Sequence, residues 1–297
     1  MVLLDLLVEQ AKSPKLKVQS RSSQISGFRP SAKDFQLIVA HYDHGIRPDS
    51  KADRIFVQRA AKVYGLPFTF DQGYLGPGAG EAESRKARYS FLEAARRATN
   101  AQGIVTAHHQ DDQLETAFIN TLRGTGRRGL TSLSSRPTLL RPLLGHSKSE
   151  LVAYAEAHDI AWRHDSSNDN NRYTRNHVRH SLLPTLTRDH RNDMLQTLAD
   201  LTDVNYQIDR KLVNHLHTQS VAGEVDRQWF IMLPHAVASE IMMTWLRAYG
   251  INNLDKKRLT MVVAKSKTLG PGKHIVVNSS HVIKVGKDRL ALAVAER

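Results

Sequence analysis

The chain has 297 residues, 40% of them hydrophobic, which is enough for a sizeable buried core and about two domains. It contains no cysteine, which excludes disulfides and thiolate metal sites, and no apolar run approaches the length of a membrane span. Its net charge of +13 favours a polyanionic partner, most often nucleic acid, over a surface that is basic only for solubility.

Residues 1–10 predict a short helix. The apolar residues 1–8 lack a basic leader and a cleavage site, so we expect neither a signal peptide nor an anchor. Residues 12–33 are rich in serine, lysine, arginine and proline, which predicts a flexible surface insertion.

Strand and helix signals then alternate along the chain. The apolar runs at residues 35–40, 67–70 and 104–107 predict strands. Helical patterns occupy residues 50–65 and 83–99. This alternation predicts an α/β fold with a doubly wound, Rossmann-like parallel sheet.

Residues 106–130, TAHHQDDQLETAFINTLRGTGRRGL, combine an acidic turn, an amphipathic helix and a Gly/Arg loop. Apolar residues three to four apart predict the helix over residues 112–123, with Asp111 and Asp112 at its positive N-terminal end. Carboxylates in this position can hold magnesium or orient an amine. Gly124 predicts a left-handed cap, and the glycines and arginines after it suit phosphate.

The remainder of the chain is mainly helical. Ser147 and Glu150 predict a capped helix that reaches residue 158. Residues 164–186 carry arginines, histidines and a tyrosine, which indicate a surface facing RNA or else a solvated basic helix end. Helical patterns continue over residues 187–217 and 234–249, and the alternating tail predicts a small antiparallel β meander.

A metal site is the main alternative for the acidic turn. The expected ligands would be His108, His109, Asp111 and Asp112, completed by His41, Asp43 and His44 from the end of another strand. Such a site would belong to a phosphohydrolase. A buried histidine with satisfied hydrogen bonds explains His108 equally well.

Five segments in order resemble the tRNA(Ile)-lysidine synthases, a bacterial family of PP-loop ATP pyrophosphatases. They are HYDHGIRPDS, EAESRKARYSFL, TAHHQDDQLETAFINTLRGTGRRGL, RPLL and DSSNDNNRYTRNHVRHSLLP. The resemblance covers residues 1–186 and is looser beyond them. It implies a catalytic domain over residues 1–186 and a helical tRNA-binding domain, ending in the β meander, over residues 187–297.

The resemblance implies that ATP and Mg²⁺ are used to join free lysine to the wobble cytidine of a tRNA(Ile) with anticodon CAU. In this family the base is adenylated with release of pyrophosphate, and the amine of lysine then displaces AMP. The location implied is cytoplasmic, with no membrane partner, and a homodimer is left open.

The resemblance also implies roles for individual residues. The catalytic residues would be Asp111, Asp112 and Glu115, with Asp111 and Asp112 also as magnesium ligands. The ATP-binding residues would be His41, His44, His108, Arg123, Gly124 and Gly126. The residues for tRNA or lysine would be Arg85, Arg88, Tyr89, Arg172, Tyr173, Arg175, Asn176 and Arg179.

The sequence departs from the family in one motif. The loop Ser-Gly-Gly-x-Asp-Ser, which follows the family's first strand and holds ATP phosphates, is absent, and MVLLDLL resembles the helix directly after it. We expect a start codon assigned too far downstream rather than a truncated gene, and translation of the upstream bases tests this.

Two alternatives stay open beside the ligase. An RNA-binding remnant would bind tRNA in a salt-sensitive way but release no pyrophosphate. A metal-dependent phosphohydrolase would act without lysine. A thiolating PP-loop enzyme is disfavoured because such enzymes usually depend on cysteines.

Overall fold

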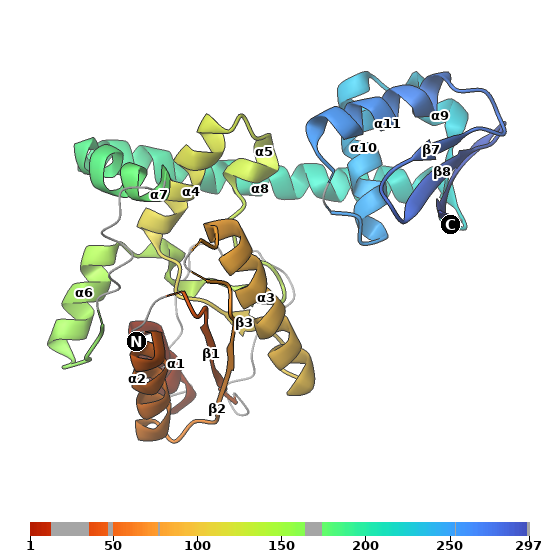
Figure 1. Ribbon diagram of the computed structural model, residues 1–297. Helices are drawn as coiled ribbons and strands as arrows, with labels where there is room; N and C mark the ends of the chain where they lie inside the picture. Colours follow the sequence, from red (N-terminus) through yellow and green to blue (C-terminus); the bar gives the residue numbers. More distant parts are fainter. Residues whose placement is uncertain (13–35, 47–49, 77, 164–173, 253, 296–297) are drawn as a thin grey trace. The chain divides into compact units, whose positions relative to one another are not determined.

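The computed structural model describes residues 1–12, 36–46, 50–76, 78–163, 174–252 and 254–295 (Figure 1). These residues divide into two units, Met1–Ala199 and Asp200–Arg297. The division falls inside helix α8 (Arg188–Thr218), whereas the sequence predicts a boundary after residue 186. The insertion expected at residues 12–33 lies almost wholly outside the described residues.

The strands of the first unit form two parallel pairs. Strand β1 (Val39–Asp43) pairs with β2 (Phe68–Gln72), and β3 (Ile104–Val105) pairs with β4 (Leu139–Leu140). Within the described ranges no hydrogen-bonded ladder joins the two pairs. The parallel pairing predicted from the strand–helix alternation is confirmed.

Helices lie on both sides of the first strand pair. Helices α2 (Ser50–Val63) and α3 (Glu81–Ala98) both contact β1, and Figure 1 shows them on opposite sides of it. The predicted doubly wound arrangement is therefore confirmed. Helix α1 (Val2–Lys12) is held through Asp5, which accepts hydrogen bonds from the hydroxyls of Tyr64 at 2.8 Å and Tyr154 at 2.9 Å.

Two local predictions are confirmed and one strand is shifted. Ser147 caps helix α6 (Lys148–Ala157), and Glu150 completes the capping box with a 2.7 Å hydrogen bond from the backbone of Ser147. The strand expected over residues 35–40 instead spans Val39–Asp43, because its partner β2 offers hydrogen bonds only to those five residues. His41 consequently lies inside the strand rather than after it.

Helix α4 (Gln110–Leu122) is the centre of a small core in the first unit. It contacts helix α7 (Thr174–His177), the π-helical turn η3 (Val178–Leu182) and the short helix η4 (Leu183–Thr185). The core residues are Leu114, Ala117, Ile119, Val178, Leu183 and Leu198. This packing fixes the face of α4 that carries Glu115 next to η3. Helix α5 (Arg127–Leu130) follows α4 after the Gly/Arg turn.

The second unit packs three helices and part of α8 against an antiparallel sheet. Its helices are α9 (Arg227–Met232), α10 (His235–Ala248) and α11 (Lys256–Thr268). Its strands are β5 (Ser220–Val221), β6 (Glu224–Asp226), β7 (His274–Val276), β8 (His281–Val285) and β9 (Arg289–Val294), in the order β5-β6-β9-β8-β7. The predicted meander is β7-β8-β9, and the β5–β6 hairpin extends it. Across the described ranges, no helix combines the length and apolar character needed to cross a membrane.

Candidate functional site

The carboxyl ends of β3 and β4 place the acidic turn and Arg141 at one edge of the sheet. The amide of Thr106 donates to the carbonyl of Leu140 at 2.9 Å, so the two chain segments leave the strands together. Arg141 follows β4 directly, and helix α4 begins five residues after the end of β3. Such an edge is where open α/β sheets bind ligands.

The two aspartates at the start of α4 are held by groups from other elements. Asp111 accepts a 2.8 Å hydrogen bond from Arg191 on α8 and a 3.1 Å hydrogen bond from the backbone of Lys148 on α6. Asp112 accepts a 3.0 Å hydrogen bond from the amide of His109 and lies 3.6 Å from the guanidinium of Arg179. These contacts fix both carboxylates in orientation.

Glu115, one helical turn further, is fully buried and ion-paired. Arg179 donates to both of its oxygens, at 2.6 and 3.0 Å, and the guanidinium of Arg175 lies 3.8 Å away. Burial raises the pKa of Glu115, while the hydrogen bonds from Arg179 act in the opposite direction. The bidentate geometry is that of a charged carboxylate–guanidinium pair.

These side chains line a cavity of about 440 Å³. Its lining residues are His109, Asp111, Glu115, Lys148, Arg179, Leu183 and Arg191. The structure therefore brings together Asp111, Glu115 and Arg179 as the resemblance implies. Lys148 and Arg191 were not predicted, because each comes from a distant helix and neither stands in a recognisable motif.

The acidic turn does not form a metal centre by itself. Each of the four carboxylate oxygens of Asp111 and Asp112 lies near an N–H group. Two of these N–H groups belong to arginine side chains and two are backbone amides. Among the residues the structure describes, no group of three histidine, aspartate or glutamate side chains is arranged to share a metal ion. Asp43, expected as a further ligand, is buried and accepts a 2.9 Å hydrogen bond from the amide of Gly45.

A second cluster of side chains is cationic. The guanidiniums of Arg85 and Arg88 lie 4.8 and 5.6 Å from the ring centre of Tyr89, and the hydroxyl of Tyr89 lies beside Arg141. His108 lies close enough for Arg141, Arg85 and Arg88 to act on its charge. Burial lowers the pKa of His108 to about 4, with Asp112 acting against this shift and the three arginines adding to it, so its imidazole is neutral at pH 7.

The predicted histidines of β1 lie apart from the lining of the cavity. Burial lowers the pKa of His41, with Asp43 and Asp53 acting against this shift. The ring of His44 packs edge-on against Tyr42 at 5.0 Å. His41 lies within β1 and His44 directly follows it, at the carboxyl end of the strand, an edge suited to a nucleotide base.

The Gly/Arg turn lies at the far end of α4 from the aspartates. Gly124 has φ +63°, which confirms the predicted left-handed cap. Twelve residues separate Asp111 from Arg123, which is about 18 Å along a helix axis. Arg123, Gly124 and Gly126 are not among the cavity-lining residues in the described part of the chain.

Two predicted tRNA contacts, Arg172 and Tyr173, lie outside the described residues. Of their neighbours, Arg175 pairs with Glu81 at 2.8 Å, and Asn176 is buried. Asn176 is therefore expected to hold the segment in place rather than to contact tRNA directly.

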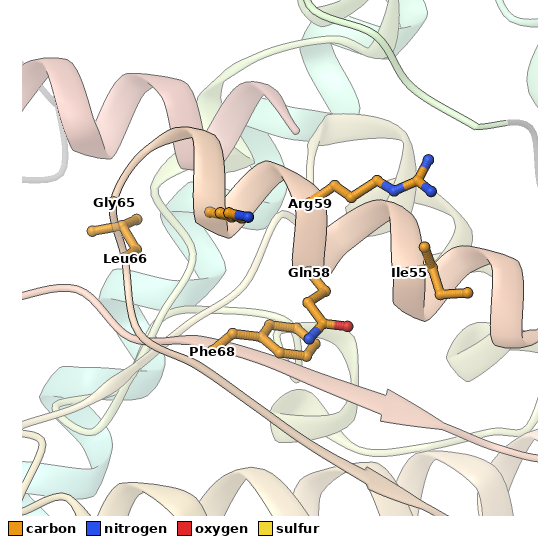
Figure 2. Close-up of a pocket in the computed structure, with 7 residues that line it drawn as sticks. Ile55, Gln58, Arg59, Gly65, Leu66 and Phe68 are labelled. Carbon is orange, nitrogen blue, oxygen red and sulfur yellow. The ribbon is translucent and has the colours of Figure 1, made fainter.

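A further cavity, of about 490 Å³, lies between α2 and the start of β2 (Figure 2). Its lining residues are Ile55, Gln58, Arg59, Lys62, Gly65, Leu66 and Phe68. Phe68 is the first residue of β2, so this cavity lies at the amino end of that strand, and it contains none of the predicted site residues.

Comparison with known proteins points to the same family as the five sequence segments. The PP-loop domain family matches residues 1–186. A tRNA(Ile)-lysidine synthase of Gloeobacter violaceus is 36% identical over 72% of this chain and 69% of its own length. The tRNA(Ile)-lysidine synthases of Solibacter usitatus and Thermus thermophilus are 37% and 39% identical over 55% and 51% of this chain. The chain spans only 38% and 31% of the lengths of these two relatives.

Proposed function

The chain belongs to the tRNA(Ile)-lysidine synthases of the PP-loop domain family, and we propose that it joins lysine to the wobble cytidine of a tRNA(Ile) with anticodon CAU. ATP is the third substrate, beside lysine and tRNA, and AMP and pyrophosphate are released. The observation that carries this proposal is the acidic cavity at the carboxyl edge of the sheet, whose carboxylates and arginines come from α4, η3 and α8.

The reaction has two steps. In the first, the ring carbonyl oxygen of the cytosine attacks the α-phosphorus of ATP, and pyrophosphate leaves. In the second, the amine of lysine attacks the activated ring carbon, and the carbon–oxygen bond breaks to release AMP. Adenylation is needed because the unmodified oxygen is a poor leaving group.

The three carboxylates of α4 supply the cation-binding and proton-accepting groups. Asp111 and Asp112 bind the amine of lysine, and a carboxylate next to that amine accepts the proton released by its attack. Arg179 donates to Glu115 and Arg191 donates to Asp111, and these hydrogen bonds keep both carboxylates charged and oriented. A substrate ammonium would share the same oxygens.

The nucleotide is proposed to lie along the same edge. His41 and His44 are placed near the adenosine, and neutral His108 lies between it and the acidic turn. Arg123, Gly124 and Gly126 would contact phosphates at the other end of α4. Because these three residues lie at the far end of the helix from Asp111, they contact a different part of the substrates from the part that Asp111 binds.

Magnesium fits this site as a partner of ATP rather than as a resident ion. Mg²⁺ is commonly held by one or two carboxylates together with substrate phosphates. Asp111 and Asp112 are its proposed ligands, and they would exchange present hydrogen bonds for the ion. When bound, the ion would neutralise phosphate charge.

For tRNA, Arg85, Arg88, Tyr89, Arg175 and Arg179 are proposed to position the anticodon loop, together with Arg172 and Tyr173. Arginines pair with phosphates and stack on unpaired bases, and tyrosine offers a further stacking face. A cytoplasmic location is part of this proposal, since the substrates are ATP, lysine and tRNA.

The proposal is tested by the release of pyrophosphate from ATP by the purified protein. We expect release that requires tRNA(Ile), stops after a single turnover when lysine is left out and continues when lysine is present, with its loss in D112N but not in the exposed control D71N. Continued release without tRNA and lysine would indicate a hydrolase and contradict the proposal. Binding of tRNA without any release would indicate an RNA-binding protein and would also contradict it.

A further inference from the structure

Asp5 joins helix α1 to two other helices through both oxygens of its carboxylate. Oδ1 accepts a 2.8 Å hydrogen bond from the hydroxyl of Tyr64, which directly follows α2. Oδ2 accepts a 2.9 Å hydrogen bond from the hydroxyl of Tyr154 on α6. All three side chains are half-buried, and hydrogen bonds to a charged group are stronger than those between neutral groups. Asp5 therefore connects α1 both to the end of α2 and to the second half of α6.

Tyr154 has a fixed orientation and remains a hydrogen-bond donor at neutral pH. Its ring stacks on the ring of His158, and the ring centres are 3.9 Å apart. Burial, and in addition the hydrogen bond to Asp5, raise the pKa of Tyr154, and the same two causes raise the pKa of Tyr64 to about 12. Both hydroxyls therefore keep the proton that they donate to Asp5.

The first turn of α6 borders the acidic cavity. The backbone amide of Lys148 donates to Oδ2 of Asp111 at 3.1 Å, and Lys148 also lines the cavity. Two further hydrogen bonds, both of 2.9 Å, run from Gln110 at the start of α4 to the carbonyls of His146 and Gly145. Three hydrogen bonds therefore hold the start of α4 against the start of α6.

Helix α6 connects the contact with Asp5 to the contact with Asp111. The six residues from Lys148 to Tyr154 span about 9 Å along the helix axis. The capping box of Ser147 and Glu150 closes the first turn, so the helix is intact up to the cavity. Because a helix of this length moves as a rigid element, a shift of its second half also shifts its first turn.

We propose that Asp5 and Tyr154 are positioning residues for Asp111. Their hydrogen bond holds α6 where the amide of Lys148 orients the carboxylate of that aspartate. This inference rests on the proposed function, in which Asp111 binds the amine of lysine. In the described part of the chain, neither Asp5 nor Tyr154 lines the cavity. Loss of their hydrogen bond should therefore weaken the binding of lysine without removing a group that touches it.

The matched variants Y154F and Y64F test this inference on the purified protein. Each removes one hydroxyl that donates to the same carboxylate, but only Tyr154 lies on α6. In the transfer of lysine to tRNA(Ile) with ATP, we expect Y154F to raise the KM for lysine about fivefold and to change kcat less than about twofold. Y64F is expected to leave this KM within about twofold of the wild-type value. Equal KM values for the two variants would contradict the inference.

The double variant D5A/Y154F tests whether Asp5 acts through Tyr154. We expect D5A to raise the KM for lysine as Y154F does, and the double variant to raise it no further, because both changes remove the same hydrogen bond. Additive increases would show that Asp5 acts by another route and would overturn its role. The comparison of Y154F with Y64F keeps the inference falsifiable should D5A fail to fold.

Hydrogen exchange measured by NMR gives a readout that does not depend on catalysis. We expect the amide of Lys148 to exchange about fivefold faster in Y154F than in the wild type, whereas the amide of Ser147, bonded to Glu150, is unchanged. The same rate for Lys148 in both proteins would refute the positioning role. Faster exchange in Y154F, together with no lysine transfer by the wild type, would refute the proposed function but leave the link to Asp111 standing.

Discussion

Glu115 is a buried carboxylate whose two oxygens accept hydrogen bonds from a single guanidinium. Such a pair contributes little net stability relative to apolar residues, but removing one partner is expensive. The pair connects α4 to η3, and it therefore fixes the geometry of the acidic cavity.

The variant R179M leaves the carboxylate of Glu115 buried beside only the more distant Arg175. We expect the free energy of unfolding at pH 7 to fall by about 2 kcal/mol, measured by urea denaturation. The double variant E115M/R179M, which buries no charge, should recover most of this loss. A single variant as stable as the wild type would contradict the ion-pair assignment.

His108 provides a prediction about pH. The pKa of this imidazole is lowered to about 4, below its ordinary value of about 6.5, so the unfolded chain binds a proton that the folded chain does not. Stability is therefore lost as pH falls from about 6.5 towards 4, by an amount on the order of 2 kcal/mol.

The measurement is the free energy of unfolding at pH 7 and at pH 4.5 for the wild type and for H108Q. We expect the wild type to lose more stability than H108Q over this interval. Equal losses, or an imidazole that titrates near pH 6.5 by NMR, would show that His108 is not held neutral by its surroundings.

Only part of the site could be predicted at the level of residues. Asp111, Asp112 and Glu115 were identifiable because they stand together at the start of one helix. Arg191 and Arg141 were not singled out, since the packing of other elements brings them to the edge. No spacing along the chain records that Arg191 lies 2.8 Å from Asp111.

At the scale of elements, the position of helix α4 is fixed at both of its ends. Its start is fixed by contacts to Asp111 and Asp112, and its end by Gly124 in the left-handed region. Gly126 lies two residues further, with an ordinary φ of −73°. A Cβ at either glycine would meet no heavy atom within 4 Å, so the two positions differ in backbone conformation rather than in space.

This difference makes G124A and G126A a matched pair. We expect G124A to lower the free energy of unfolding by about 1 kcal/mol, because an L-residue is strained at positive φ. G126A is expected to be neutral within about 0.5 kcal/mol. Thermal or urea unfolding measures both, and equal effects would show that the cap does not stabilise α4.

The helices and strands of the fold were easier to predict than the residues at which they begin and end. Apolar runs identified the parallel strands, and the box of Ser147 and Glu150 identified α6. Strand β1 extends to Asp43, beyond the apolar run at residues 35–40, because it pairs with β2 as far as Asp43. The hairpin β5–β6 was missed, since strands of two and three residues are too short to show a periodicity.

At the scale of the whole molecule, the net charge of +13 predicts that tRNA binding depends strongly on salt. We expect affinity for tRNA(Ile) to fall by more than about a hundredfold between 50 and 200 mM salt, because each neutralised phosphate releases counterions. Filter binding over a salt series measures the slope. A shallow slope, equivalent to about one phosphate, would exclude the broad basic surface that the composition indicates.

The two units of the chain carry different features that matter for the proposed function. The first carries the acidic cavity and the arginine cluster, and the PP-loop domain family matches residues 1–186 of it. The second is proposed as the tRNA-binding domain. Its core is formed by α10, α11 and the antiparallel sheet, and none of the cavity-lining residues belongs to it.

The most direct measurement is the transfer of labelled lysine to tRNA by the purified protein with ATP. We predict that label is incorporated into tRNA(Ile) with anticodon CAU and not into a methionine tRNA that carries the same anticodon. The label should sit on the wobble cytidine after nuclease digestion. Failure to label the isoleucine tRNA, or equal labelling of both tRNAs, would contradict the account.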